Sequence, residues 1–375
     1  VPSSPNLSWT PCYWNFTCAN LIVPLDYDNP SIGNITVAFL KKAAKHQPAK
    51  GDVLINPGGP GGSGVDFVIN YDEVLESLLG GTYNLIGFDP RGVNNSGPNL
   101  DCFAGKPATR DYYDQNYYTY DPTSALSMAE HFQAAGAFGD WCSKTVGYQA
   151  NYANTPATAR DMLQYVEKLA ESQGKAPEKA TLNYYGISYG SVLGTTFATL
   201  FPDRVGRMII DGVVDVEDYY HGSWTANLRQ ADDAVRSFFQ FCFDAGSECA
   251  FFRNDSSPGA IGKRFDALLE HIEKHPIPVS DPAIVDFPTV ITAFDVRGAL
   301  LIFIYDSIST FPLLALVLSE LEGGSMANMI LLRLSSRASP MAAIPRRAHF
   351  TSYFLRFCES LSLLTHFIMA YIYCS

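Results

Sequence analysis

The sequence has few charged residues and no excess of positive ones. Only 17% of its 375 residues are charged, and 38 acidic residues outnumber 26 lysines and arginines, which gives a formal net charge of −12. A nucleic-acid partner is excluded on this ground, because its phosphates call for a basic face. No long charge run or low-complexity tract indicates disorder, and with 47% hydrophobic residues the chain can bury a large core.

Motifs for metal and phosphate are also missing. None of the eight cysteines stands in a Cys-x-x-Cys or Cys/His pattern with zinc spacing. The glycine-rich stretch at residues 57–64 lacks the Gly-Lys-Ser/Thr ending of a P-loop, and its glycines are not spaced as in the dinucleotide fingerprint. We therefore expect neither a metal ion nor an organic cofactor.

No apolar stretch satisfies the criterion for a membrane span. Residues 299–318 are interrupted by Asp306 and Pro312, so we interpret them as two packed helices. Residues 361–374 are too short and carry His366. We expect no contact with a membrane.

Cysteines and glycosylation sequons indicate an oxidising compartment. Six of the cysteines form locally plausible pairs, although eight cysteines allow 105 connectivities. Five Asn-x-Ser/Thr sequons suit a glycosylated, secreted protein from a eukaryote. The chain begins at Val1 with no leader pattern, so we expect any signal peptide to have been removed or left out. The pairs are Cys12 with Cys18, Cys102 with Cys142, and Cys242 with Cys249, and the sequons begin at Asn6, Asn15, Asn34, Asn94 and Asn254.

Apolar strands alternate with amphipathic helices in the first part of the chain. This alternation predicts an α/β fold with a mostly parallel sheet and helices on both faces. Strands are expected at residues 34–39, 53–55, 83–88, 181–185 and 207–211, and helices at 65–79, 125–144, 155–172 and 191–200.

From about residue 216 the alternation stops and helical patterns dominate. We expect helices at residues 232–243, 259–275, 292–305 and 311–322. The predicted organisation is an α/β core at residues 1–215, a helical region at 216–332 and an atypical tail at 333–375.

A candidate nucleophile lies at residues 186–190, which read Gly-Ile-Ser-Tyr-Gly. The pentapeptide follows a short apolar run and precedes a helix-like segment, the strand–turn–helix context of a nucleophile elbow. Its two glycines are needed because side chains at these positions would collide with the strained turn that carries Ser188. The motif alone is short enough to occur by chance.

A second motif supports the first. The predicted strand at residues 52–56 runs directly into the glycine-rich stretch at residues 57–64. Acyl transfer needs backbone N–H groups aimed at the developing oxyanion, and such a turn can supply one of them. The N–H of Tyr189 would be the other. A flexible loop is the alternative interpretation of the glycines.

These motifs carry a family resemblance. They occur in the order found in α/β-hydrolases, and the sequence most resembles the secreted tripeptidyl and prolyl aminopeptidase-like branch over roughly residues 9–330. The stretches that carry the resemblance are residues 18–27, Asn-Pro-Gly-Gly-Pro-Gly-Gly-Ser-Gly at 56–64, Gly-Phe-Asp-Pro-Arg-Gly at 87–92, Tyr-Gly-Ile-Ser-Tyr-Gly at 185–190, Phe-Pro-Asp-Arg-Val at 201–205 and Asp-Gly-Val-Val-Asp at 211–215.

The resemblance implies an α/β-hydrolase fold with a helical cap that selects substrates. By this resemblance Ser188 attacks a peptide carbonyl next to a free N-terminus, the N–H groups of Gly59 and Tyr189 bind the oxyanion, and an acyl-enzyme is then hydrolysed. The turn at residues 89–92 is expected to shape the pocket wall. A carboxylate of the cap would bind the amine of the peptide substrate, although a solvated surface charge is the ordinary role of such residues. The candidates are Glu217, Asp218 and Asp233.

The acid and the base of a catalytic triad are not identifiable. The histidines after Ser188 are His221, His271, His275, His349 and His366, and none has the family's final Gly-His context. We therefore expect the fold to be incomplete at the C-terminus, without the two strands that would carry the acid and the base. The resemblance is expected to end near residue 335, with a divergent but genuine C-terminus as the alternative.

A chain without a general base would lose several orders of magnitude in rate. Two rivals to the peptidase interpretation stay open. An esterase or lipase would use the same nucleophile and oxyanion hole. A non-catalytic binding protein of hydrolase fold is favoured by the missing base.

Overall fold

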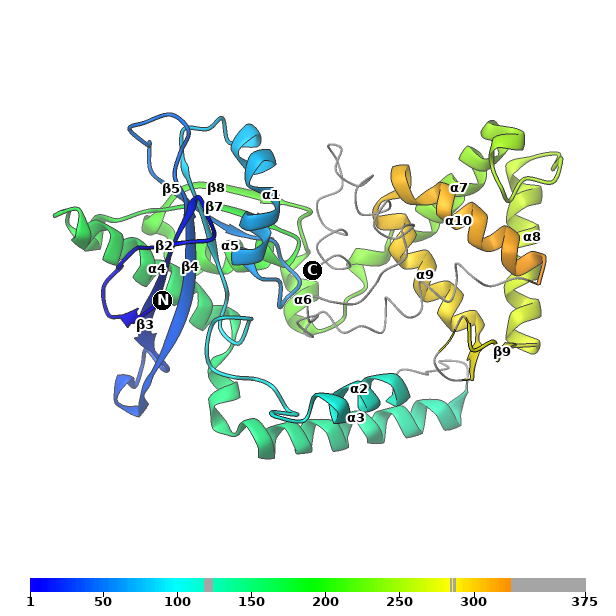
Figure 1. The fold of residues 1–375 in the computed structure, drawn as a ribbon, viewed down its shortest axis with the longest axis horizontal. Coiled ribbons are helices and arrows are strands. Elements are labelled where there is room, and N and C mark those ends of the chain that lie inside the picture. The colour runs from blue at the N-terminus through cyan, green and yellow to red at the C-terminus, as the bar shows by residue number, and fades with distance from the viewer. Residues whose placement is uncertain (118–123, 284, 286–287, 325–375) are drawn as a thin grey trace. The chain divides into compact units, whose positions relative to one another are not determined.

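The computed structural model describes residues 1–117, 124–283, 285 and 288–324 (Figure 1). The chain forms two compact units, of which the first comprises residues 1–109 and 134–223 and the second residues 110–133 and 224–375. Residues 216–223 therefore belong to the first unit. The role of the helical region as a substrate-selecting cap stays a prediction.

The first unit is built on a twisted sheet. Its strands are β1 (Ser3–Ser4), β2 (Thr10–Cys12), β3 (Phe16–Pro24), β4 (Asn34–Lys42), β5 (Asp52–Asn56), β6 (Asn84–Phe88), β7 (Leu182–Ile187) and β8 (Val205–Asp211). The strand order is β1-β3-β4-β6-β5-β7-β8, with β2 paired to β3. Strands β6, β5, β7 and β8 are parallel neighbours, whereas β4 pairs antiparallel with β3 and β6. The predicted α/β fold with a mostly parallel sheet is confirmed.

Helices cover both faces of this sheet (Figure 1). Along β5 and β6 the side chains of Leu54 and Ile86 enter a buried cluster that includes Met162 and Phe197. These two residues lie on α4 (Thr155–Ser172) and α5 (Tyr189–Leu200). Helix α1 (Gly64–Leu78) contacts the opposite face, because successive residues of a strand point to opposite sides.

Polar residues set the starts of these helices where the sequence pattern predicts them. Ser63 caps α1 by accepting the Asp66 N–H, and Asn154 caps α4 by accepting the Ala157 N–H. Such caps satisfy backbone donors that have no partner within the helix. The two caps fix where the chain turns from sheet to helix.

The edge strand β8 carries apolar side chains into solvent. Ile209 is 53% exposed and Val213, just beyond the strand, is 61% exposed. Within the described residues β8 has β7 as its neighbour on one side and no strand on the other. A sheet that ends at β8 leaves an apolar edge of this kind exposed.

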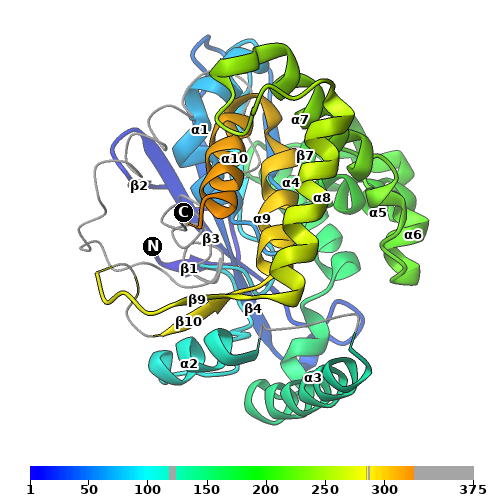
Figure 2. The same ribbon diagram turned by 90° about the vertical axis from the view of Figure 1, so that its right-hand side faces the viewer.

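The second unit is mainly helical (Figure 2). Its elements are α7 (Ala231–Ala245), α8 (Pro258–Lys274), α9 (Ala293–Tyr305), α10 (Ser307–Glu322) and a hairpin of β9 (Ile277–Val279) and β10 (Thr289–Ile291). The four helices share one buried core, which includes Phe238, Ile272, Phe303 and Leu318. Helices α9 and α10 break at Asp306, as predicted for residues 299–318.

Two substantial elements were not predicted. Strand β3 mixes polar and apolar residues and shows no clean alternation. Helix α2 (Pro107–Tyr117) lacks an apolar stripe, so periodicity could not reveal it. Helix α3 (Ala125–Val146) was predicted and ends two residues beyond the expected position.

The three predicted disulfides are present: Cys12–Cys18, Cys102–Cys142 and Cys242–Cys249. Cys358 and Cys374 lie outside the described residues. Among the helices of the described part of the chain, none combines the length and the apolar run that crossing a membrane requires.

Candidate active site

Ser188 occupies a strained turn between a strand and a helix. It follows Ile187, the last residue of β7, and precedes Tyr189, the first residue of α5. Its φ of 56° and ψ of −121° are unusual for a residue with a side chain, and its N–H donates to the Asp211 carbonyl at 2.9 Å. Strain at one polar residue in this context is the mark of a nucleophile elbow.

The elbow needs glycine on both sides because backbone carbonyl oxygens lie close to both positions. A Cβ atom at Gly186 would lie 2.4 Å from the Gly190 carbonyl oxygen, and one at Gly190 would lie 2.6 Å from the Asn56 carbonyl oxygen. Both distances are shorter than real Cβ contacts allow. The structure thus gives the physical reason for the Gly-x-Ser-x-Gly spacing.

The glycine-rich loop touches the elbow through Gly58. A Cβ atom on Gly58 would lie 2.5 Å from the Ile187 carbonyl oxygen and 3.0 Å from the Tyr189 nitrogen. Gly58 also has a φ of +99°. The sequence analysis named Gly59 and did not single out Gly58, whose contact depends on how the two loops meet and leaves no separate signal in the sequence.

The backbone donors at this contact differ in their bonding. The Gly58 N–H donates to the side-chain oxygen of Asn56 at 3.0 Å. The N–H groups of Gly59 and Tyr189 make no hydrogen bond within the described part of the chain. The two N–H groups predicted to bind an oxyanion are therefore without internal acceptors, whereas the neighbouring one is occupied.

Asn56 is fully buried at the end of β5, beside the elbow. Its Oδ1 accepts the Gly58 N–H, while its Nδ2 has no partner among the described residues. A buried amide N–H without an acceptor is costly, so such an atom in a native fold calls for an explanation. Asn56 was part of the family stretch at residues 56–64 but was not predicted as a site residue.

Ser188 is partly exposed, and its hydroxyl has no hydrogen-bond partner among the residues that the structure describes. No described histidine hydrogen-bonds to it. His221 ends the short helix α6 (Val216–His221), whereas His271 and His275 lie in and just after α8, where their rings contact each other. His349 and His366 lie outside the described residues.

Asp89 links the turn after β6 to the glycine-rich loop. Its fully buried carboxylate accepts the Ser63 hydroxyl at 2.5 Å and the Val65 N–H at 3.3 Å, both at the start of α1. The backbone and side chain of Asn95 donate to its other oxygen. Burial raises the pKa of the Asp89 carboxyl, and these hydrogen bonds oppose that rise. The geometry makes Asp89 a support for the loop.

Arg91 and Asp161 form a buried ion pair in the same unit. The guanidinium donates twice to the carboxylate, at 2.6 and 2.8 Å, and Tyr27 donates to it at 2.7 Å. Burial raises the pKa of the Asp161 carboxyl, and its bonds to Arg91 and Tyr27 oppose that rise. The remaining guanidinium N–H groups donate to the carbonyls of Pro24, Leu25 and Tyr152.

Tyr189 is anchored on both sides of its ring. Its hydroxyl lies 2.8 Å from the Thr155 hydroxyl at the start of α4, and its ring centroid lies 5.8 Å from that of Tyr219 on α6. Burial raises the pKa of Tyr189 to about 12. These contacts fix the residue whose N–H is the predicted oxyanion donor and bring α6 beside the elbow.

The predicted amine-binding carboxylates lie in two places. Glu217 and Asp218 are in the first turn of α6, in the same unit as Ser188. Asp233 is in α7 of the other unit, where it pairs with Arg236 at 2.5 Å. Among the described residues no group of three or more His, Cys, Asp or Glu side chains is arranged to hold a metal ion.

The sequence that forms this site matches the profile of one protein family. The profile of the alpha/beta hydrolase fold family matches residues 52–255, which are more than half of the chain and include the glycine-rich loop and the elbow. The chain belongs to the α/β-hydrolase-fold family. The predicted resemblance is confirmed at this level.

Curated relatives of this α/β-hydrolase carry peptidase and esterase names. It is 32% identical to "Tripeptidyl aminopeptidase" of Streptomyces lividans over 56% of this chain and 38% of that protein. It is 29% identical to "Serine protease Hip1" of Mycobacterium bovis over 64% of this chain and 45% of that protein. It is 28% identical to "Carboxylesterase B" of Mycobacterium tuberculosis over 74% of this chain and 52% of that protein. The chain thus spans about two fifths to one half of these relatives.

Proposed function

We propose that this α/β-hydrolase is a secreted serine exopeptidase that releases residues or short peptides from a free N-terminus. The Ser188 oxygen bonds to the carbonyl carbon, and the N–H groups of Gly59 and Tyr189 stabilise the oxyanion. The peptide C–N bond then breaks, and the leaving amine takes up a proton in place of the one that the serine hydroxyl loses. The acyl-enzyme that forms is then hydrolysed by water. The strained backbone of Ser188 against the glycine-rich loop carries this proposal.

The unoccupied donors support the proposed oxyanion hole. Donors in such a site must be free of internal acceptors and held in place before the reaction. The N–H of Gly59 and that of Tyr189 meet the first condition. The Asn56 amide and the Thr155 hydroxyl hold the adjoining atoms, which meets the second.

Peptide specificity is supported by the names of two relatives. The two acidic residues in the first turn of α6, Glu217 and Asp218, offer a partner for an amine. Glu217 is exposed and makes no ion pair in the described part of the chain, whereas Asp233 is paired. We assign Glu217 as the first candidate to bind the positively charged N-terminus of the substrate. Disulfides support the secreted location, because they persist in oxidising compartments.

Turnover of three substrates tests this function. A peptide amide with a free N-terminus, the same peptide with an acetylated N-terminus, and an acyl ester are compared with wild-type chain and Ser188→Ala. With a general base in place, we expect the free-amine peptide to react fastest and Ser188→Ala to lose on the order of a thousandfold or more in rate, whereas a chain without a base should show little turnover that depends on Ser188. Glu217→Gln should raise KM for the free-amine peptide alone, and Asp233→Asn is its matched control.

The "Carboxylesterase B" relative favours one alternative. Equal turnover of the two peptides, or turnover of the ester alone, would assign the chain to the esterases. Absence of any Ser188-dependent turnover would assign it to the non-catalytic binding proteins of this fold.

A further inference from the structure

The second unit holds one glycosylation sequon on a braced loop. The loop follows the helical turn at Gly246–Glu248 and ends at Ser257, which caps α8 through the Ala260 N–H. The Cys242–Cys249 disulfide ties its first end to α7. Asn254 stands between these two anchors, with Ser256 two residues on.

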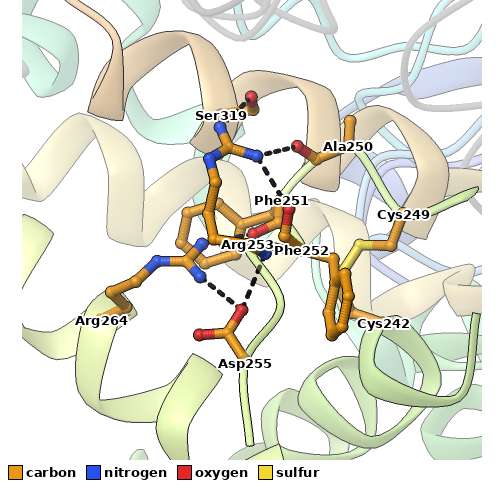
Figure 3. Close-up of a disulfide and its surroundings, with 9 residues drawn as sticks. All are labelled: Cys242, Cys249, Ala250, Phe251, Phe252, Arg253, Asp255, Arg264 and Ser319. Carbon is orange, nitrogen blue, oxygen red and sulfur yellow. Dashed lines mark hydrogen bonds and ion pairs between the residues drawn. A yellow bond between two sulfur atoms is a disulfide. The ribbon is translucent and has the colours of Figure 1, made fainter. Parts of the chain in front are cut away.

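The residues on either side of Asn254 are held by hydrogen bonds (Figure 3). The Arg253 guanidinium donates to the Ala250 carbonyl at 2.8 Å and to the Ser319 hydroxyl at 2.8 Å. The Asp255 carboxylate accepts a hydrogen bond from Arg264 Nη1 at 2.5 Å and another from the Arg253 N–H at 3.0 Å. Two helices of the unit, α8 and α10, therefore fix the backbone before and after Asn254.

Asn254 itself is turned outward. It is exposed, has a φ of +56°, and its side-chain amide makes no hydrogen bond among the described residues. Asparagine adopts this left-handed backbone region more readily than most residues. Ser256, the hydroxyl residue of the sequon, is exposed as well.

Asn94 shows the opposite arrangement. Its sequon also carries an exposed asparagine with a positive φ, of 42°. Its Nδ2, however, donates to the Asp66 carboxylate at 3.1 Å, and the third residue of the sequon, Ser96, is buried and donates to the Asp89 carbonyl at 2.7 Å. A sugar on this nitrogen would disturb the start of α1.

We propose that Asn254 is an N-glycosylation site and that Asn94 is left unmodified in the folded protein. In this reaction Asn254 Nδ2 forms a bond to the anomeric carbon of a lipid-linked oligosaccharide. The bond from that carbon to the lipid diphosphate breaks, the diphosphate leaves with the electron pair, and Nδ2 loses one proton. No contact within the described residues has to break for Asn254 to carry the sugar. The inference is independent of the proposed catalysis and rests on the proposed secretion.

Peptide mapping tests this site. The full chain is produced behind a cleavable secretion signal in a eukaryotic host, and glycans are removed by a peptide N-glycanase in water labelled with heavy oxygen. We expect Asn254 to become a heavy aspartate in most copies and Ser256→Ala to abolish this. Asn94 should stay unconverted in secreted chain, and exposed Asn99, which has no sequon, reports spontaneous deamidation.

Glycans are attached to the nascent chain, so the same mapping on total cell material reads Asn254 even in chains that are not secreted. An unmodified Asn254 in chains whose Cys242–Cys249 bond has formed would overturn the proposal. Occupancy of Asn94 equal to that of Asn254 in the secreted pool would overturn its second half.

Discussion

The side-chain oxygen of Asn56 accepts the N–H of Gly58 at 3.0 Å. This bond joins the end of β5 to the residue of the glycine-rich loop that touches the elbow, since Gly58 approaches both Ile187 and Tyr189. It also uses the Gly58 donor and leaves the next one, on Gly59, unoccupied. We therefore propose that Asn56 positions the oxyanion hole.

Asn56→Ala should lower the rate at which a phosphonate probe labels Ser188. The variant leaves the Gly58 N–H without its buried acceptor, at a cost of about 1–3 kcal/mol in unfolding free energy. The matched control is Asn84→Ala at the opposite end of the parallel strands, which removes the bond that Asn84 accepts from the Ala44 N–H at 2.9 Å and the one that it donates to the Asp52 carboxylate at 2.7 Å. Equal labelling rates for two equally destabilised variants would show that Asn56 serves stability alone.

Gly58→Ala should lower the free energy of unfolding by more than the positive φ of Gly58 alone explains. The added methyl group would overlap the Ile187 carbonyl oxygen at 2.5 Å, so the loop must move away from Ser188. Gly33→Ala is the control, because Gly33 also has a positive φ, of +135°, yet nothing lies within 4 Å of the added atom. We expect Gly58→Ala to cost roughly 1–3 kcal/mol more than Gly33→Ala in denaturant unfolding. Equal costs would refute the contact.

Asp161→Asn should destabilise the protein by roughly 3–5 kcal/mol, because it leaves the Arg91 guanidinium buried without its counter-charge. Both side chains of the pair are at most 1% exposed. Glu171→Gln removes one partner of a surface pair with Lys168, whose nitrogen lies 2.8 Å from the carboxylate, and should change stability by less than about 0.5 kcal/mol. Urea unfolding measures both, and similar small changes would contradict the structural role of Arg91.

Stability should fall at alkaline pH. Burial raises the pKa of Tyr185 and of Tyr189 to about 12, and in Tyr185 the carboxylate of Asp211 adds to the rise. The ordinary tyrosine pKa is about 10, so the unfolded chain loses these protons first. The contribution is fully present below pH about 10 and is lost as pH rises towards about 12.

Tyr189→Phe should reduce the slope of unfolding free energy against pH in that window. The exposed Tyr148→Phe is the control and should leave the slope unchanged. A wild-type protein whose stability stays constant from neutral pH to pH about 12 would contradict the burial of these rings.

Local patterns predicted the parts of the fold that repeat regularly. The strands that become β5 and β7 and the helices that become α4 and α8 were predicted from apolar periodicity, and the caps at Asn154 and Ser257 explain where these helices begin. Strand β3 was missed because its polar and apolar residues do not alternate cleanly. Helix α2 was not predicted because its sequence has no apolar stripe.

The candidate site divides in the same way. The motif at residues 186–190 predicts the elbow because a strained turn between strand and helix requires glycine on both sides of Ser188. Gly58 and Asn56 could not be singled out, because their approaches to Ile187 and Gly190 join segments more than a hundred residues apart. The structure contributes those long-range contacts.

The most direct test of the account is covalent labelling of Ser188. The chain is treated with a fluorophosphonate probe and its peptides are mapped by mass spectrometry, alongside Ser188→Ala and the control variant Ser172→Ala at an exposed serine of α4. The account predicts an adduct on Ser188 that disappears in Ser188→Ala and persists in Ser172→Ala. A chain with its three disulfides formed that carries no adduct on Ser188, or carries it on another serine, would contradict the account.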